Sequence, residues 1–167
     1  MGSSIKLKSF EGEGSTFYFD LTLTTVETTV PRDRRPIDEV KDLGNARILA
    51  VDDLDFNLIT LSKIIGKWNV QVTTAVNGLE AVEKVRNDDF DLVLMDLQMP
   101  VMGGREATEK IREFDTELPI IALTASTNES TRREVLALGM NDFAGKPFEP
   151  DQLYRKLKSH IHPKEEA

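Results

Sequence analysis

Along residues 46–162, the apolar and polar positions alternate between two patterns, one typical of buried strands and one typical of amphipathic helices. Short apolar runs predict strands at about 47–52, 70–76, 90–96, 119–124 and 142–146. Between these runs, apolar residues recur at helical spacing, which predicts a helix after each strand. The run at 90–96 is continuous, as expected of a central parallel strand that is covered on both faces.

Each predicted helix carries a stripe of apolar residues. The stripes are Leu58, Leu61, Ile65 and Trp68; Leu79, Val82 and Val85; Ala107, Ile111 and Phe114; positions within 131–138; and Leu153, Leu157 and Ile161. Asp55 is the expected N-cap of the first helix, because its carboxylate can accept a hydrogen bond from a free helical amide. Asn77-Gly78 predicts the turn into the second helix.

The repeated strand–helix units predict an α/β fold with a doubly wound parallel sheet. The flavodoxin-like strand order 2-1-3-4-5 is the common solution for five such units. In this order strands 1 and 3 are neighbours where the winding reverses, and ligands bind outside the carboxyl ends of the strands at that point. The predicted domain covers residues 46–162, and residues 163–167 form a tail.

Residues 1–45 do not share this pattern. Ile5-Lys6-Leu7-Lys8 and residues 17–23 alternate with period two, and Glu11-Gly12-Glu13-Gly14-Ser15 between them is typical of a turn. We therefore expect a β-hairpin within residues 1–24, followed by a charged, proline-containing linker at 25–45. A lone hairpin is marginally stable. We expect its apolar face, which includes Phe17, Phe19, Leu21 and Leu23, to pack on the C-terminal domain or on another chain, which includes a dimer formed through the hairpin.

The bulk composition narrows the function classes. The chain has 167 residues, a net charge of −8 and no cysteine, which excludes disulfides and thiolate metal sites. The acidic balance argues against nucleic acid as a partner, because a general grip on phosphates needs a basic surface. No apolar run approaches the roughly 20 residues of a membrane span, and no signal peptide is recognisable. We expect a cytoplasmic location and no membrane contact.

Chemically reactive side chains stand at the ends of the predicted strands: Asp52 and Asp53, Asp96, Thr124 and Lys146. Two carboxylates about 4 Å apart repel by about 4 kcal/mol at an effective dielectric constant near 20, so three in one crevice need a cation. Mg²⁺ suits such oxygen ligands, with Mn²⁺ as an alternative. Lys146 could bind a phosphate oxygen and Thr124 could donate to it. Asp96 would then form an acyl phosphate.

Each of these residues alone has an ordinary explanation as a helix cap or loop residue, but together they resemble a known family, the receiver domains of two-component response regulators. The resemblance covers about residues 46–162. It rests on Val51-Asp52-Asp53, Asn77-Gly78-Leu79-Glu80-Ala81, Leu94-Met95-Asp96-Leu97-Gln98-Met99-Pro100, Ala122-Leu123-Thr124-Ala125 and Gly145-Lys146-Pro147-Phe148.

The resemblance implies a role for each matching residue. Asp96 would be the phosphoacceptor, and Asp52, Asp53, Asp96 and the backbone carbonyl of Gln98 would hold the metal. Thr124 and Lys146 would contact the phosphate. These roles are completed by Phe143 as the aromatic switch residue and by a cis bond between Lys146 and Pro147. Phe143 could equally be ordinary edge-strand packing.

Two departures from the family pattern affect the loops. Gly103-Gly104 stands where the family often has Asp-Gly, which removes a side-chain cap of the third helix and predicts a more mobile loop. Leu54 replaces a common asparagine after the acid pair. His160 and His162, near the end of the last helix, are expected to be solvated.

Residues 2–9 and 12–19 look like the final hairpin of a histidine-kinase ATPase domain, without its nucleotide-binding motifs. The resemblance therefore implies a piece of a hybrid sensor histidine kinase, whose parent is membrane-anchored if its upstream segments cross a bilayer. We expect no ATP-dependent activity from this piece. Its phosphodonor would be a histidine-kinase domain or a histidine phosphotransfer domain. The alternatives are a non-catalytic docking domain and an aspartyl-phosphate phosphatase, which usually has an acid where this chain has Gln98.

Overall fold

The computed structural model describes residues 5–10, 12, 14–19, 41–126 and 128–161, which belong to two compact units divided after residue 37. The larger unit contains a five-stranded sheet in the order β4-β3-β5-β6-β7, with every neighbouring pair parallel. Its strands are β3 (Ala46–Val51), β4 (Val70–Ala75), β5 (Leu92–Asp96), β6 (Ile120–Thr124) and β7 (Asp142–Gly145). The predicted 2-1-3-4-5 order is confirmed.

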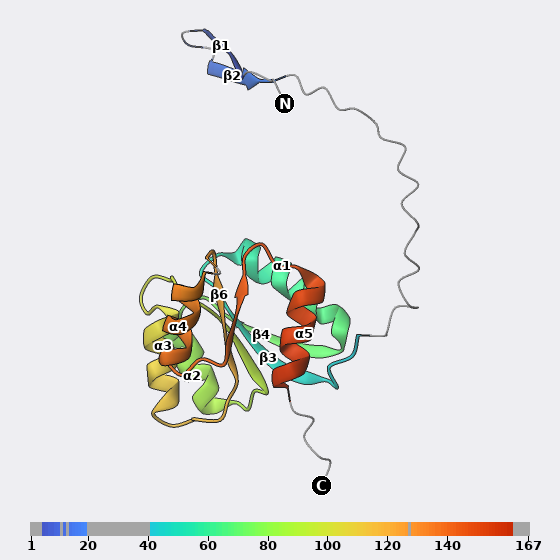
Figure 1. Ribbon diagram of the computed structural model, residues 1–167, viewed down its shortest axis with the longest axis vertical. Coiled ribbons are helices and arrows are strands. Elements are labelled where there is room, and N and C mark those ends of the chain that lie inside the picture. Colours follow the sequence, from blue (N-terminus) through green and yellow to red (C-terminus); the bar gives the residue numbers. More distant parts are fainter. Residues whose placement is uncertain (1–4, 11, 13, 20–40, 127, 162–167) are drawn as a thin grey trace. The chain divides into compact units, whose positions relative to one another are not determined.

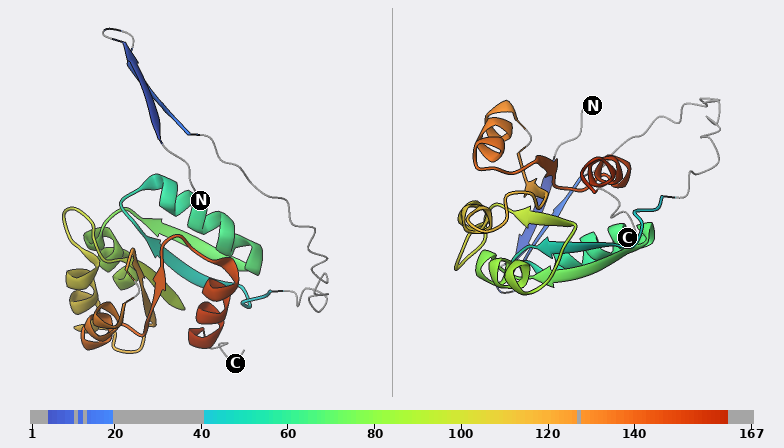
Figure 2. Two further views of the ribbon diagram at one scale, coloured as in Figure 1. Left: turned by 45° about the horizontal axis from the view of Figure 1, so that its top comes forward. Right: turned by 90° about the horizontal axis from the view of Figure 1, so that it is seen from below.

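Helices cover both faces of this sheet (Figure 1). They are α1 (Asp55–Ile65), α2 (Gly78–Asn87), α3 (Gly104–Arg112), α4 (Glu129–Ala137) and α5 (Pro150–His160), with a short 3-10 helix η1 (Gly66–Trp68) after α1. Helices α1 and α5 lie on one face, and α2, α3 and α4 lie on the other (Figure 2). The apolar core is accordingly divided into two clusters, one on each side of the sheet.

Two of the three interior strands are buried along their whole length. Every residue of β5 and β6 is buried, because these strands have a neighbour on each side and helices on both faces. Their continuous apolar sequences match that environment. Asp96 and Thr124 are the last residues of these strands, so the packing of the core fixes where their side chains begin.

Three local predictions were wrong. Asp55 does not cap α1: the N-cap is Leu54, which makes no side-chain cap, and Asp55 lies in the first turn. Leu79 is 44% exposed, because the buried side of α2 is formed by Gly78, Ala81 and Val82. Phe114 lies beyond the end of α3 and is 41% exposed.

The smaller unit contains the predicted hairpin. Strands β1 (Lys6–Phe10) and β2 (Gly14–Tyr18) pair antiparallel, and all ten of their residues are exposed. Gly12 and Gly14 have φ of 84° and 95°, a backbone conformation that suits glycine in the turn. Leu21 and Leu23, which were expected to extend the apolar face, lie outside the described residues, as does His162. The predicted packing of the hairpin on another surface stays a prediction.

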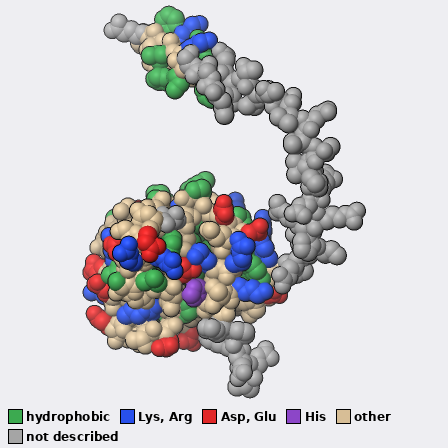
Figure 3. Space-filling model, in the orientation of Figure 1, with side chains coloured by type: hydrophobic (Ala, Val, Ile, Leu, Met, Phe, Trp, Pro, Cys, Tyr) green, Lys and Arg blue, Asp and Glu red, His purple; other side chains and the backbone are tan. Residues whose placement is uncertain are grey.

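The surface of the larger unit is mixed in charge. On the face that Figure 3 shows, acidic and basic side chains are interspersed. Ion pairs such as Arg105 with Glu134, which join α3 to α4 at 2.8 Å, are part of this pattern. Among the described residues, no helix combines the length and the apolar character that a bilayer crossing requires.

Helix α3 begins directly against the end of β5. A Cβ atom added to Gly104 would lie 2.0 Å from the carbonyl oxygen of Asp96 and 2.7 Å from Cγ of Met95. The amide of Gly104 also donates to the carbonyl of Leu97 at 3.2 Å. Gly104 therefore allows an approach of the helix to the strand that no other residue permits. Gly103, its neighbour, is the N-cap and makes no side-chain cap, as expected from the sequence.

We predict that Gly104→Ala lowers the free energy of unfolding by about 1–3 kcal/mol, because the added methyl group must displace the backbone of Asp96. Gly66→Ala is the matched control: Gly66 has φ of −60° and nothing within 4 Å of an added Cβ. This control should be neutral or stabilising by about 0.4–1 kcal/mol. Urea unfolding measures both, and equal effects of the two substitutions would contradict the close contact at Gly104.

Candidate functional site

The reactive side chains lie at one edge of the sheet. Asp52 follows β3 directly, Asp96 ends β5, Thr124 ends β6, and Lys146 follows β7. These strands are parallel, so their carboxyl ends share one edge. The strand order makes β3 and β5 neighbours, which brings Asp52 next to Asp96.

Three carboxylates form an acidic cluster at this edge. Asp52, Asp53 and Asp96 each offer one oxygen, and the three oxygens lie within 4.8 Å of one another. Asp52 is only 1% exposed and Asp96 is 9% exposed. Carboxylates this close repel one another strongly where water is excluded, so the cluster favours a bound cation. Oxygen-only ligands in this number suit a hard divalent ion.

Lys146 provides a cation within the protein itself. Its Nζ donates to Oδ2 of Asp52 at 2.6 Å and to Oδ2 of Asp96 at 2.8 Å. Burial lowers the pKa of Lys146, but the hydrogen bonds to the two carboxylates outweigh this effect, and the net pKa is raised. The side chain therefore stays an ammonium at neutral pH and bridges the two acids that come from different strands.

Asn57 also contacts Asp52, and the sequence interpretation missed it. Its Nδ2 lies 2.9 Å from Oδ1 and 3.1 Å from Oδ2 of Asp52, and the amide of Leu54 donates to Oδ1 at 3.0 Å. Asn57 is in the first turn of α1, five residues after Asp52. The only signal in the sequence is an amide side chain about one helical turn beyond the acid pair.

Thr124 is joined to the site through the backbone. The amide of Lys146 donates to the carbonyl of Thr124 at 2.8 Å, which extends the pairing of β6 and β7 beyond the strand ends. The Thr124 hydroxyl is 3.1 Å from both the amide and the carbonyl of Ser126, so it belongs to the turn that follows β6. Gln98 lies in the loop after β5, and its backbone N–H is 3.4 Å from Oδ1 of Asp96.

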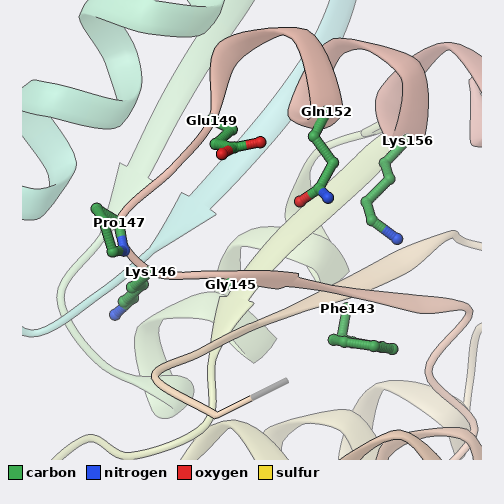
Figure 4. A pocket seen from close by; sticks show the side chains of 7 residues that line it. All are labelled: Phe143, Gly145, Lys146, Pro147, Glu149, Gln152 and Lys156. Carbon is green, nitrogen blue, oxygen red and sulfur yellow. The ribbon is translucent and has the colours of Figure 1, made fainter. Parts of the chain in front are cut away.

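Phe143 and Lys146 border a depression of about 490 Å³ beside α5. Figure 4 shows its lining: Phe143, Gly145, Lys146 and Pro147 come from β7 and the loop after it, and Glu149, Gln152 and Lys156 come from the start and body of α5. The Phe143 ring is half-buried, and the Lys156 ammonium lies 5.2 Å from its centroid. The Lys146–Pro147 peptide bond is cis, the isomer expected from the sequence.

Asp142, at the start of β7, lies beside two basic side chains of α5, one of which, Lys156, lines this depression. Lys156 Nζ is 2.7 Å from Oδ2 of Asp142, and His160 Nε2 is 3.7 Å from the same oxygen. His160 is therefore beside a carboxylate and only partly exposed, rather than freely solvated as the sequence suggested.

Exposed apolar side chains surround the acidic edge. Leu54, Phe56 and Ile59 on or before α1, Val76 and Leu79 after β4, and Val101 after β5 are all between 44% and 79% exposed. Leu54, Val76 and Val101 are in the loops after β3, β4 and β5, and the other three are near the starts of α1 and α2, so they lie toward the same edge as the acids. We call these six residues the apolar rim. Val101 has φ of 69°, an unusual conformation for a β-branched residue.

Comparison with known proteins identifies the domain. Residues 48–158 match the family model of the response regulator receiver domain. The chain is 42% identical to the sensor protein GacS of Pseudomonas syringae pv. syringae over 112 residues, which are 64% of this chain and 12% of GacS. It is 35% identical to the autoinducer 2 sensor kinase/phosphatase LuxQ of Vibrio vulnificus over 157 residues, 92% of this chain and 18% of LuxQ. The chain thus spans less than a fifth of these relatives.

Two solved structures are similar in fold and sequence. One is the receiver domain of the sensor histidine kinase PA1611 from Pseudomonas aeruginosa PAO1, with a magnesium ion coordinated in its active site cleft (TM-score 0.65, 34% identity, 70% of this chain and 98% of that one). The other is the receiver domain of Ssk1 from Saccharomyces cerevisiae, in complex with the histidine phosphotransfer protein Ypd1 (TM-score 0.67, 31% identity, 71% and 90%). With its strand order, its acidic edge and the family match over residues 48–158, this chain belongs to the response regulator receiver domain family.

Proposed function

We propose that this receiver domain accepts a phosphoryl group on Asp96 from a phosphohistidine, in a reaction that requires Mg²⁺. One observation supports this most: the Lys146 ammonium bridges Asp52 and Asp96 at the edge where three carboxylates meet. The arrangement offers a nucleophilic carboxylate, ligands for a divalent cation and a fixed positive charge, which are the parts that phosphoryl transfer needs.

The residues fit a magnesium ion by their chemistry. Asp52, Asp53 and Asp96 supply carboxylate oxygens, and the backbone carbonyl of Gln98 completes the proposed ligands. The bound ion would neutralise charge on the transferred phosphoryl group. The magnesium-containing receiver domain of PA1611 supports the choice of ion, and Mn²⁺ is the alternative.

In the proposed reaction an Asp96 carboxylate oxygen attacks phosphorus, and the bond between phosphorus and the donor imidazole nitrogen breaks. The imidazole keeps the electron pair of that bond and takes up a proton, and Asp96 becomes an acyl phosphate. Lys146, already 2.8 Å from Asp96, would hold a phosphoryl oxygen, and Thr124 would turn its hydroxyl from Ser126 toward the same group. The domain needs only to position these groups, because the donor supplies the activated phosphoryl group.

The new phosphate would change the balance of contacts at the edge. It adds about −1.5 to −2 charges, which compete with Asp52 for the Lys146 ammonium. A movement of Thr124 toward the phosphate would open space beside β6, and the half-buried ring of Phe143, on the neighbouring strand β7, would move into it. We propose that this coupled movement carries the signal onward.

We further propose that the apolar rim is where the phosphodonor docks. Phe56 and Val101, 78% and 79% exposed, are the most exposed members of the rim. A partner must cover the acidic edge to bring its histidine to Asp96, and burial of these side chains would stabilise that contact. The complex of the Ssk1 receiver domain with a histidine phosphotransfer protein supports this class of partner.

The wider context that we propose is a hybrid sensor histidine kinase. The match to LuxQ covers 92% of the 167 residues. Whichever end the uncovered residues lie at, the match includes residues 16–150, so the similarity extends into β2 of the hairpin. We propose that residues 1–24 are the terminal hairpin of an upstream ATPase domain and that a linker within residues 25–45 joins it to the receiver domain. The last residues of that range belong to the larger unit, because Leu43 is buried in its core and its amide donates to the carbonyl of Trp68 at 2.9 Å. The exposed aromatic side chains of the hairpin would then pack within that upstream domain or against a second chain.

The phosphoacceptor can be tested with a small phosphodonor such as phosphoramidate. With Mg²⁺, intact-mass spectrometry should show one phosphoryl group on the wild-type protein, and none after chelation or in Asp96→Asn. Asp55→Asn, which changes an exposed acid three residues beyond Asp52, should behave like the wild type. Incorporation by Asp96→Asn at the wild-type level would show that the phosphoacceptor is another residue.

We propose that Lys146 and the metal ion compete for the carboxylates of Asp52 and Asp96, which a stability measurement can test. We predict that Lys146→Met, in chelator, lowers the free energy of unfolding by about 1–3 kcal/mol, because Asp52 and Asp96 lose a charged donor. Mg²⁺ should restore this loss by binding roughly tenfold more tightly than to the wild type, which stabilises the folded state by linkage. The control Lys84→Met removes a surface pair with Glu80 and should leave the effect of Mg²⁺ unchanged. A smaller Mg²⁺ effect in Lys146→Met than in the wild type would argue against the competition.

If the protein phosphodonor docks on the apolar rim, a substitution in the rim should slow phosphorylation by that protein but not by a small phosphodonor. Phe56→Ser should raise the KM for a phosphorylated histidine phosphotransfer protein about five- to thirtyfold, the effect of losing 1–2 kcal/mol of contact energy. Its phosphorylation by phosphoramidate should not change. Leu136→Ser, on α4 and 45% exposed, serves as the control and should leave both reactions intact. If Phe56→Ser slows both donors equally, the rim is not a docking surface.

A further inference from the structure

Asp52 is the most deeply buried acid of the cluster, and the protein itself must satisfy its carboxylate. At 1% exposure it has almost no access to bulk water. Four donor contacts surround it: the amide of Leu54 on Oδ1, the Lys146 ammonium on Oδ2, and the side-chain amide of Asn57 on both oxygens. Of the side chains that the structure describes, Asn57 is the one that contacts both oxygens. From this geometry we propose that Asn57 is a positioning residue that fixes the Asp52 carboxylate and thereby sets the affinity of the acidic cluster for a divalent cation. The inference rests on the metal site of the proposed function.

The identity of the side chain at position 57 matters to this role. An ionised carboxylate can only accept hydrogen bonds, so the Asn57 amide must present its nitrogen to Asp52. The nitrogen carries two hydrogens and no charge. It can therefore hold both oxygens without competing electrostatically with a metal ion, as a lysine or arginine would. An aspartate at this position would instead repel Asp52.

The backbone around Asn57 makes its position rigid. The backbone N–H of Asn57 donates to the carbonyl of Leu54 at 2.9 Å, so the first turn of α1 is closed at this residue. The helix has no side-chain N-cap at Leu54, and Asp52 instead accepts from the Leu54 amide. The hydrogen bonds from Leu54 and Asn57 to Asp52 thus fix both the carboxylate and the start of α1. A rotation of the carboxylate would break contacts on both of its oxygens.

A purely structural role for Asn57 makes a different prediction from a positioning role. If Asn57 only anchors α1, its loss lowers the melting temperature but leaves metal affinity unchanged in the folded protein. If it orients Asp52, the metal encounters a ligand in several orientations and binds more weakly. Partners that orient metal ligands typically contribute 10- to 100-fold to metal affinity.

The test is the dissociation constant for Mg²⁺, measured by isothermal titration calorimetry on the whole chain. Asn57→Leu keeps nearly the same size and removes the donor, and we expect its Kd to rise 10- to 100-fold. Asn57→Ala should weaken binding less, because a water can enter beside Asp52, and it replaces Asn57→Leu if that variant does not fold. The matched control is Asn87→Leu: Asn87 donates to the Glu83 carbonyl on the exposed side of α2, and its loss should leave Kd unchanged.

The outcomes separate this inference from the proposed function. If the wild type binds Mg²⁺ and both Asn57 variants bind it with the wild-type Kd, the positioning role is wrong and the metal site stands. If the wild type gives no Mg²⁺ binding, the metal site itself fails and the positioning role fails with it. A 10- to 100-fold rise in Kd with the folded state intact, judged by an unchanged far-ultraviolet circular dichroism spectrum, supports the inference.

Discussion

The repulsion among three carboxylates held at one edge of a parallel sheet is the constraint on which the rest of this domain depends. Asp52, Asp53 and Asp96 are brought together by the strand order, which makes β3 and β5 neighbours. The fold cannot separate them without changing its topology, so it must supply positive charge and hydrogen-bond donors. Lys146 supplies the charge from β7, two strands away from β5. The ends of three strands are thereby joined by one ammonium group.

The apolar core restricts the movement of the strand ends that carry the acids and strengthens the repulsion between them. Because β5 and β6 are buried throughout, the strand ends have little freedom to move apart. Low exposure also strengthens every electrostatic interaction at the edge. The close approach of Gly104 to Asp96 extends this rigidity into the loop, and Val101 in the same loop has a backbone conformation that costs about 1–3 kcal/mol. Val101 itself is exposed, and a hydrogen bond from the Met102 amide to the Pro100 carbonyl at 2.8 Å closes the turn around it.

The sequence predicted the features that follow from the spacing of apolar residues, and it missed contacts between side chains of different elements. Continuous apolar runs ending in Asp96 and Thr124 predicted the strands, because burial on both faces leaves a clear pattern. The strand order, and with it the acidic edge, came from the common arrangement of five strand–helix units. The contact of Asn57 with Asp52 could not be read in the same way. It depends on how far α1 starts from the end of β3, which apolar spacing does not encode. Leu79 was misplaced for a related reason: it fits the helical period, but the small residues Gly78 and Ala81 are what bring α2 close to its neighbours.

Charge balance implies an order for the proposed reaction, in which the metal ion binds before the phosphoryl group arrives. Three carboxylates and one ammonium leave two formal negative charges, so an approaching phosphoryl group, itself anionic, is repelled. A divalent cation would cancel both charges. Lys146 would then no longer be needed by two carboxylates and could turn to the phosphoryl oxygens. On this view the ammonium holds the strand ends together while the metal is absent and reads the phosphate once the metal has bound. A single lysine directly after β7 would thus stabilise the resting domain and report its modification, two roles that an ammonium between two acids could combine.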